Sequence, residues 1–120
     1  MYKRQSISNA AEFKPYQEAK ISLNEFQEYR AIIVEEFGET AKLFPEQNLV
    51  IYFDNSMGNY AFTVEGHAAH PSWIARRVVQ DDGSFSIEQI GYFAGEEKHF
   101  AYLYQQYLDL NEQIKKNIGK

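Results

Sequence analysis

Hydrophobic residues recur at helical spacing near the start of the chain. The apolar positions of this stripe are Leu23, Phe26, Ile33 and Phe37. Ser22 and Glu25 precede it in the S-x-x-E arrangement of a capping box, in which each side chain satisfies a free backbone N–H of the first turn. The pattern predicts a helix that begins at Ser22 and ends before Pro45, since a proline disfavours helical backbone in the residue before it.

A second helical stripe follows Gly95 and runs to the C-terminal end. Its apolar positions are Phe100, Leu103, Tyr104, Tyr107, Leu108 and Ile114. Lys115 and Lys116 come at its end, where positive charge complements the helix dipole. The spacing therefore predicts a long amphipathic C-terminal helix.

Between the two helices the pattern alternates with the period of a β-strand. Residues 49–54 and 60–65 alternate on either side of a turn-forming stretch. A two-residue turn at Met57-Gly58 would place Phe53 opposite Phe62 and Ile51 opposite Val64. One face would then be apolar, and the other would carry Tyr52, Thr63 and Glu65.

A second hairpin is predicted between residues 73 and 93. Asp82-Gly83 is a strong two-residue hairpin turn sequence. The register that it sets pairs Val78 with Ile87, Arg77 with Glu88 and Trp73 with Tyr92. Opposite charges and aromatic rings then face each other, which supports this register.

The expected fold class is α+β. The element order α-β-β-β-β-α predicts a four-stranded antiparallel meander sheet with an N-terminal and a C-terminal helix packed on one face. The chain has 120 residues, the usual size of one domain. We expect a single α+β domain over residues 11–120.

Residues 1–10 are expected to stand outside this domain. Residues 1–5 are basic and without periodicity, as in a translated adaptor, and Ser8-Asn9-Ala10 matches the small-x-small pattern of a signal-peptidase site. Two alternatives stay open: a scar or signal-peptide remnant, which predicts a periplasmic or secreted protein, and a disordered N-terminus of a cytoplasmic one.

Composition excludes several classes of function. The formal net charge is −5, with 17 acidic against 12 basic residues, which argues against nucleic-acid binding. The sequence has no cysteine, so disulfides and thiolate chemistry are excluded. No apolar run reaches the roughly 18–20 residues of a membrane span. An acidic, cysteine-free domain is the simplest interpretation.

His67 and His70 form an H-x-x-H pair between the two hairpins. Zinc takes three or four protein ligands, and this pair supplies two at most. Glu65 could join, which leaves a small hydrolase, metal-assisted or not, as an alternative. The sequence is not H-E-x-x-H, and Pro71 opposes a continuing helix. We therefore expect a polar loop without metal.

Other catalytic patterns are missing from the sequence. No G-x-S-x-G or phosphate-binding glycine loop occurs, and no cofactor is expected. Glu96 and Glu97 suggest an acid pair, but acids in a first helical turn are explained by the helix dipole. These absences favour a non-catalytic domain.

Arg76 and Arg77 are adjacent in a predicted strand and so point to opposite faces. The predicted ligand- or partner-binding residues are Trp73, Arg76, Tyr92 and Tyr102. The leading hypothesis is a small, exported, non-catalytic binding domain that recognises a protein or a small molecule. The alternatives are the hydrolase above and an inhibitor or immunity-type protein that acts on a partner.

Overall fold

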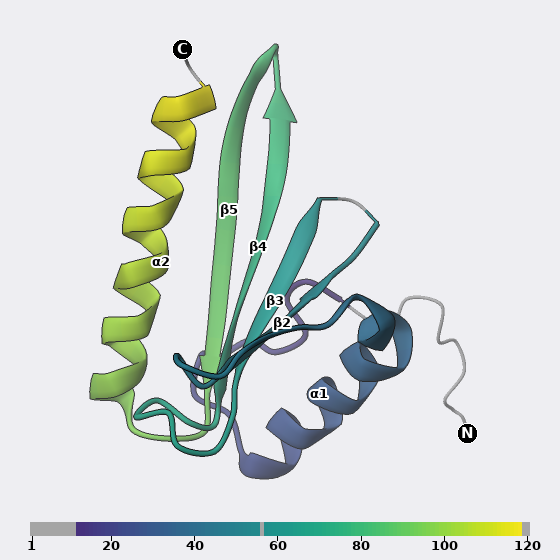
Figure 1. The fold of residues 1–120 in the computed structure, drawn as a ribbon, viewed down its shortest axis with the longest axis vertical. Coiled ribbons are helices and arrows are strands. Elements are labelled where there is room, and N and C mark those ends of the chain that lie inside the picture. Colours follow the sequence, from purple (N-terminus) through teal and green to yellow (C-terminus); the bar gives the residue numbers. More distant parts are fainter. Residues whose placement is uncertain (1–11, 56, 119–120) are drawn as a thin grey trace.

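The computed structural model describes residues 12–55 and 57–118, and it confirms the α+β class (Figure 1). The helices are α1 (Leu23–Phe37), followed by a 3-10 turn (Gly38–Thr40), and α2 (Glu97–Ile118). The strands are β1 (Lys42–Phe44), β2 (Leu49–Phe53), β3 (Gly58–Thr63), β4 (Ser72–Asp81) and β5 (Ser84–Phe93). They form one antiparallel meander in the order β1-β2-β3-β4-β5.

The predicted start of α1 is confirmed. The Glu25 backbone N–H donates to Ser22 Oγ at 3.1 Å, and the Ser22 N–H donates to Glu25 Oε1 at 2.9 Å, which completes the capping box. The helix ends at Phe37, well before Pro45, and Phe26, Tyr29 and Ile33 are its buried residues. One face of α1 therefore packs on the sheet, although Leu23 of the predicted stripe is exposed and Tyr29, which is outside that stripe, is buried.

The prediction of four strands is wrong by one. Strand β1 pairs with β2 through Leu43 opposite Val50 and Phe44 opposite Leu49. All three β1 residues are exposed, so the alternation of a half-buried strand is missing from the sequence. Backbone pairing with β2 across a tight turn, rather than burial, holds this edge strand in place.

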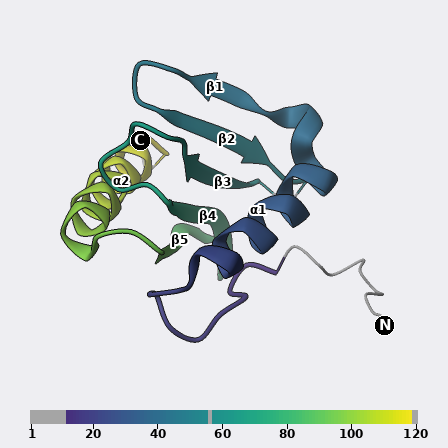
Figure 2. The same ribbon diagram turned by 90° about the horizontal axis from the view of Figure 1, so that it is seen from below.

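The prediction that both helices pack on one face is also wrong. Trp73 and Ala75 of β4 pack in the cluster that contains α1, whereas Ile74 between them packs with Phe100 of α2. The helices therefore cover opposite faces of the sheet, as Figure 2 shows. The central strands are apolar on both faces, and a sheet of this kind needs cover on both sides.

The predicted register of the first hairpin is wrong. Tyr52 lies opposite Tyr60 and Phe53 opposite Asn59, three positions away from the predicted pairing. The turn is longer than two residues, because Asp54 bridges it: its N–H donates to the Gly58 carbonyl at 3.0 Å, and its Oδ1 accepts from the Gly58 N–H at 2.8 Å. An odd shift exchanges faces, so Tyr52 and Phe62 both face α1.

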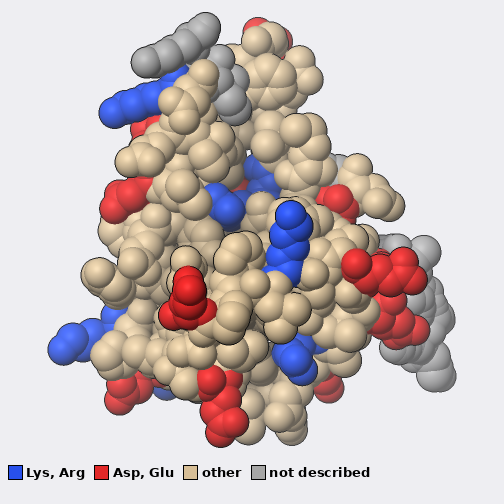
Figure 3. Space-filling model, viewed as in Figure 1, with Lys and Arg blue, Asp and Glu red and all other residues tan. Residues whose placement is uncertain are grey.

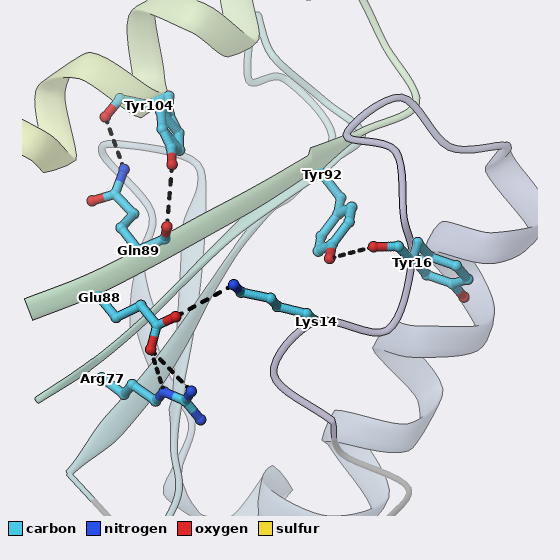
Figure 4. Close-up of polar contacts among 7 residues, drawn as sticks. All are labelled: Lys14, Tyr16, Arg77, Glu88, Gln89, Tyr92 and Tyr104. Carbon is cyan, nitrogen blue, oxygen red and sulfur yellow. Dashed lines mark hydrogen bonds and ion pairs between the residues drawn. The ribbon is translucent and has the colours of Figure 1, made fainter. Parts of the chain in front are cut away.

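The second hairpin is confirmed in every predicted pair. Val78 lies opposite Ile87, Arg77 opposite Glu88 and Trp73 opposite Tyr92. Arg77 Nε donates to Glu88 Oε1 at 2.9 Å, and Lys14 Nζ lies 3.5 Å from Glu88 Oε2 (Figure 4). The two strands extend beyond β1–β3 as a long arm along α2 (Figure 1).

The predicted signal-peptidase site and the rest of residues 1–10 lie outside the described residues, so both alternatives for this segment stay predictions. Neither helix of the described chain combines the length and the apolar character that a membrane crossing requires.

Candidate functional site

Two of the four predicted binding residues lie in the core under α1. Trp73 is 0% exposed, and its ring stacks on Tyr29 at 4.4 Å between centroids. Tyr92 is 1% exposed, and its hydroxyl donates to the Tyr16 carbonyl at 2.9 Å (Figure 4). A ligand cannot reach either ring, so the aromatic pair that the hairpin register predicts serves the core.

The other two predicted residues lie on the α2 side but not in one site. Tyr102 is 70% exposed on α2. Arg76 is half-buried on the sheet face that α2 covers, where it lines a groove with Tyr107 and Leu103. The four predicted residues therefore do not form one site. Arg76 is the only one of the four that lines the groove.

The groove lies between α2 and the edge strands β1 and β2. Helix α2 packs over β3, β4 and β5 through Ala61, Ile74 and Phe93, which leaves this face of β2 and β1 beside the helix uncovered. The hollow has a volume of about 640 Å³. Its lining residues are Phe44, Gln47, Leu49, Ile51, His67, Arg76, Leu103, Gln106, Tyr107 and Leu110. Figure 3 shows a largely uncharged surface here, with basic atoms set back between α2 and the strands.

Arg76 is held in the groove by residues of α2. Its Nη1 donates to Asn111 Oδ1 at 2.8 Å, and its Cζ lies 4.6 Å from the centre of the Tyr107 ring. Its Nε is buried without a hydrogen-bond partner among the described residues. The guanidinium is thus positioned by α2, while not all of its five N–H donors are used within the described chain.

The positive charge of Arg76 is not neutralised. None of the ion pairs in the described part of the chain includes this arginine. Burial lowers the pKa of Arg76, and the Tyr107 hydroxyl opposes that shift. A buried charge is normally paired, so an arginine without an acidic partner stands out as a place for an external anion.

A chain of side-chain amides holds Asn111 in turn. Asn111 Nδ2 donates to Gln89 Oε1 at 2.7 Å, and Gln89 Nε2 donates to the Tyr104 carbonyl at 3.1 Å. The Tyr104 hydroxyl donates back to the Gln89 carbonyl at 3.2 Å (Figure 4). The network links β4, β5 and α2 and fixes the position of the Arg76 guanidinium.

Sequence reasoning missed Asn111, although an indication was available. Asn111 follows Tyr107 by four residues, so it lies on the apolar stripe of α2, and it is 7% exposed. A polar residue inside an apolar helical stripe needs a buried partner. Arg76 of β4 is that partner, because its Nη1 donates to Asn111 Oδ1.

The histidine pair lies in the β3–β4 loop, as expected, but the two rings face different surroundings. His67 lines the groove, and its Nδ1 accepts from the Ala69 N–H at 2.9 Å. His70 packs edge-on against Phe26, and its Nδ1 lies 2.8 Å from Thr63 Oγ1. Burial lowers the pKa of both histidines, with a further contribution to His67 from His70.

The structure does not bring His67, His70 and Glu65 together as the hydrolase alternative requires. Glu65 is exposed, and its charge acts on His70 from a distance. Within residues 12–55 and 57–118, no three His, Asp or Glu side chains gather as metal ligands. Glu96 pairs with His99 at 3.2 Å at the start of α2, away from the groove lining.

Comparisons with known proteins add no further constraint. No protein-family model, no curated protein and no solved structure matches this chain.

Proposed function

We propose that this protein is a non-catalytic binding domain whose groove takes a small amphipathic carboxylate. Arg76 binds the carboxylate, and the walls that include Leu49, Leu103 and Leu110 cover the apolar body. The observation that carries the proposal is a half-buried, unneutralised guanidinium, fixed by Asn111, inside an apolar groove.

The chemistry of the groove selects the anion. A guanidinium presents paired N–H donors that match a carboxylate, and charge-assisted hydrogen bonds are the stronger kind. Binding would neutralise a charge that the described chain leaves unpaired, so the ligand carboxylate takes the place of an acidic side chain. The volume of about 640 Å³ falls within the roughly 300–1,000 Å³ of small-molecule pockets.

The recessed position of Arg76 favours a small molecule over a protein partner. A stable protein interface buries about 800 Å² on each side and has its anchoring residues at an exposed surface. Arg76 is instead half-buried beneath Tyr107 and Asn111. It lines the groove, so a small ligand bound there can contact it.

Decanoate and decanol are suitable probes, because they differ only in the charged end. The protein is expected to bind decanoate about tenfold tighter or more, the ratio of a charge-assisted hydrogen bond worth at least 1.4 kcal/mol. The measurement is isothermal titration calorimetry at fixed salt. Arg76→Met should remove the preference, since it keeps the apolar stem and deletes the charge.

Arg77→Met is the matched control. It makes the same charge change one residue away, on the opposite face of the sheet, and should keep the preference for decanoate. The proposal fails if the wild-type protein binds neither probe, or if Arg76→Met keeps the preference. It also fails if sedimentation shows a dimer that covers the groove and excludes decanoate.

A further inference from the structure

The groove has a second polar group at the end away from Arg76. His67 belongs to a loop that is tied to the start of β2: the Val64 N–H donates to the Asn48 carbonyl at 3.0 Å, and the His67 N–H donates to the Val64 carbonyl at 3.1 Å. Arg76 lies opposite Asn59, which pairs with Phe53 at the other end of β2. The two polar side chains therefore stand at opposite ends of one groove.

The separation can be gauged from the elements between them. Leu49 and Phe53 are four residues apart on β2, about 13 Å at the rise of a strand. Leu103 and Leu110 are seven residues apart on α2, about 10 Å at the rise of a helix. The apolar lining between the ends consists of Leu49, Ile51, Leu103 and Leu110. A ligand that spans the groove thus has an apolar body of roughly this length.

The His67 ring has one nitrogen in use and one free. Nδ1 accepts from the Ala69 N–H at 2.9 Å, so in the neutral ring the proton is on Nε2. Nε2 has no hydrogen-bond partner among the residues that the structure describes. Burial lowers the pKa of His67, which favours this neutral form near pH 7. His67 lines the groove, and in this tautomer its unpartnered nitrogen is the donor Nε2–H.

We infer that the ligand is polar at both ends: a carboxylate bound by Arg76, an apolar middle, and an uncharged oxygen that accepts from His67 Nε2–H. The ligand class is an ω-hydroxy, ω-oxo or ω-amide derivative of an aliphatic acid. This inference rests on the proposed function, because it assumes that Arg76 binds the carboxylate and adds a requirement at the far end.

Aliphatic acids and their ω-hydroxy derivatives test the inference across a series of chain lengths. At the length that spans the groove, the ω-hydroxy acid is expected to bind about three- to tenfold tighter than the plain acid, the ratio of one net hydrogen bond. His67→Asn should abolish this ratio, because the asparagine oxygen can still accept from the Ala69 N–H while no donor remains at the Nε2 position. His99→Asn is the matched control, since His99 lies outside the groove lining.

The outcomes separate the two proposals. If plain acids bind in an Arg76-dependent way and no ω-hydroxy acid binds tighter, the proposed function stands and the inference is wrong. The inference is also wrong if His67→Asn keeps the ratio while circular dichroism shows an intact fold. If no acid of either series binds, the proposed function and the inference fail together.

Discussion

Arg76 and Arg77 are neighbours in β4, yet their guanidinium groups lie on opposite sides of the sheet. Arg76 lies over the Tyr107 ring of α2 at 4.6 Å, and Arg77 lies over the Phe13 ring at 4.1 Å and pairs with Glu88 at 2.9 Å. The alternation of a strand makes this separation, and the two helices on opposite faces give the two arginines different surroundings.

The two arginines should differ in their contribution to stability. Arg76→Ala removes a packed stem and leaves Asn111 Oδ1 without its donor, which should cost about 1–3 kcal/mol in the free energy of unfolding. Arg77→Ala removes an exposed ion pair and a ring contact, each worth up to about 1 kcal/mol. Urea unfolding midpoints of the two variants measure the difference. Equal midpoints, or a lower midpoint for Arg77→Ala, would contradict the larger contribution expected of Arg76.

Asn111→Asp should abolish the preference of the groove for a carboxylate while keeping a side chain of nearly the same size. The new carboxylate would lie at hydrogen-bond distance from Arg76 and neutralise it from within, so the preference for decanoate over decanol should fall at least tenfold. Calorimetry with the two probes gives this ratio. Asn117→Asp adds the same charge to an exposed position of α2 and should leave the preference unchanged. A preserved preference in Asn111→Asp would show that Arg76 does not bind the carboxylate.

Zinc should not act as a tight ligand of the histidine loop. The two rings face different surroundings, since His67 lines the groove and His70 packs against Phe26, and no third His, Asp or Glu gathers with them among the described residues. Zinc added to chelator-treated protein should therefore leave the thermal midpoint unchanged, whereas a tight native-state ligand raises it. Stoichiometric zinc in purified protein, lost in His67→Asn and in His70→Asn, would reverse this conclusion.

The stability of the fold should fall in alkaline solution, because tyrosines that pack near α1 lose their protons there. Burial, with help from Glu28 and Glu25, raises the pKa of Tyr16 from 10.0 to about 12, and burial also raises the pKa of Tyr29. The folded state then holds these protons more tightly than the unfolded state, so the stabilisation is complete below pH 10 and is lost as the pH rises through about 12. Urea midpoints at graded pH measure the loss.

Two tyrosine variants check the origin of this alkaline loss. Tyr29→Phe lacks one of the buried hydroxyls and should show a shallower decline with pH, even if its midpoint at neutral pH is lower. Tyr102→Phe changes an exposed ring on α2 and should follow the wild-type curve. Identical slopes in all three proteins would mean that the buried tyrosines do not cause the alkaline loss.

The features that could be predicted from the sequence are those that depend on residues close together in the chain. The capping box of Ser22 and Glu25 starts α1, and Asp82-Gly83 sets the register of the β4–β5 hairpin, because both act over a few residues of chain. The same register separates Arg76 from Arg77. The α+β class, the second helix and the loop position of the histidines followed from the same local patterns.

The features that could not be predicted depend on contacts between segments that are distant in the chain. Strand β1 has no buried face and exists only through its pairing with β2, and Asp54 lengthens the first turn through contacts that alternation does not encode. The helices took opposite faces because the central strands are apolar on both sides. The groove results from the position of α2. This helix packs over β3–β5, which brings Asn111 to Arg76 and leaves the face of β2 beside the helix open.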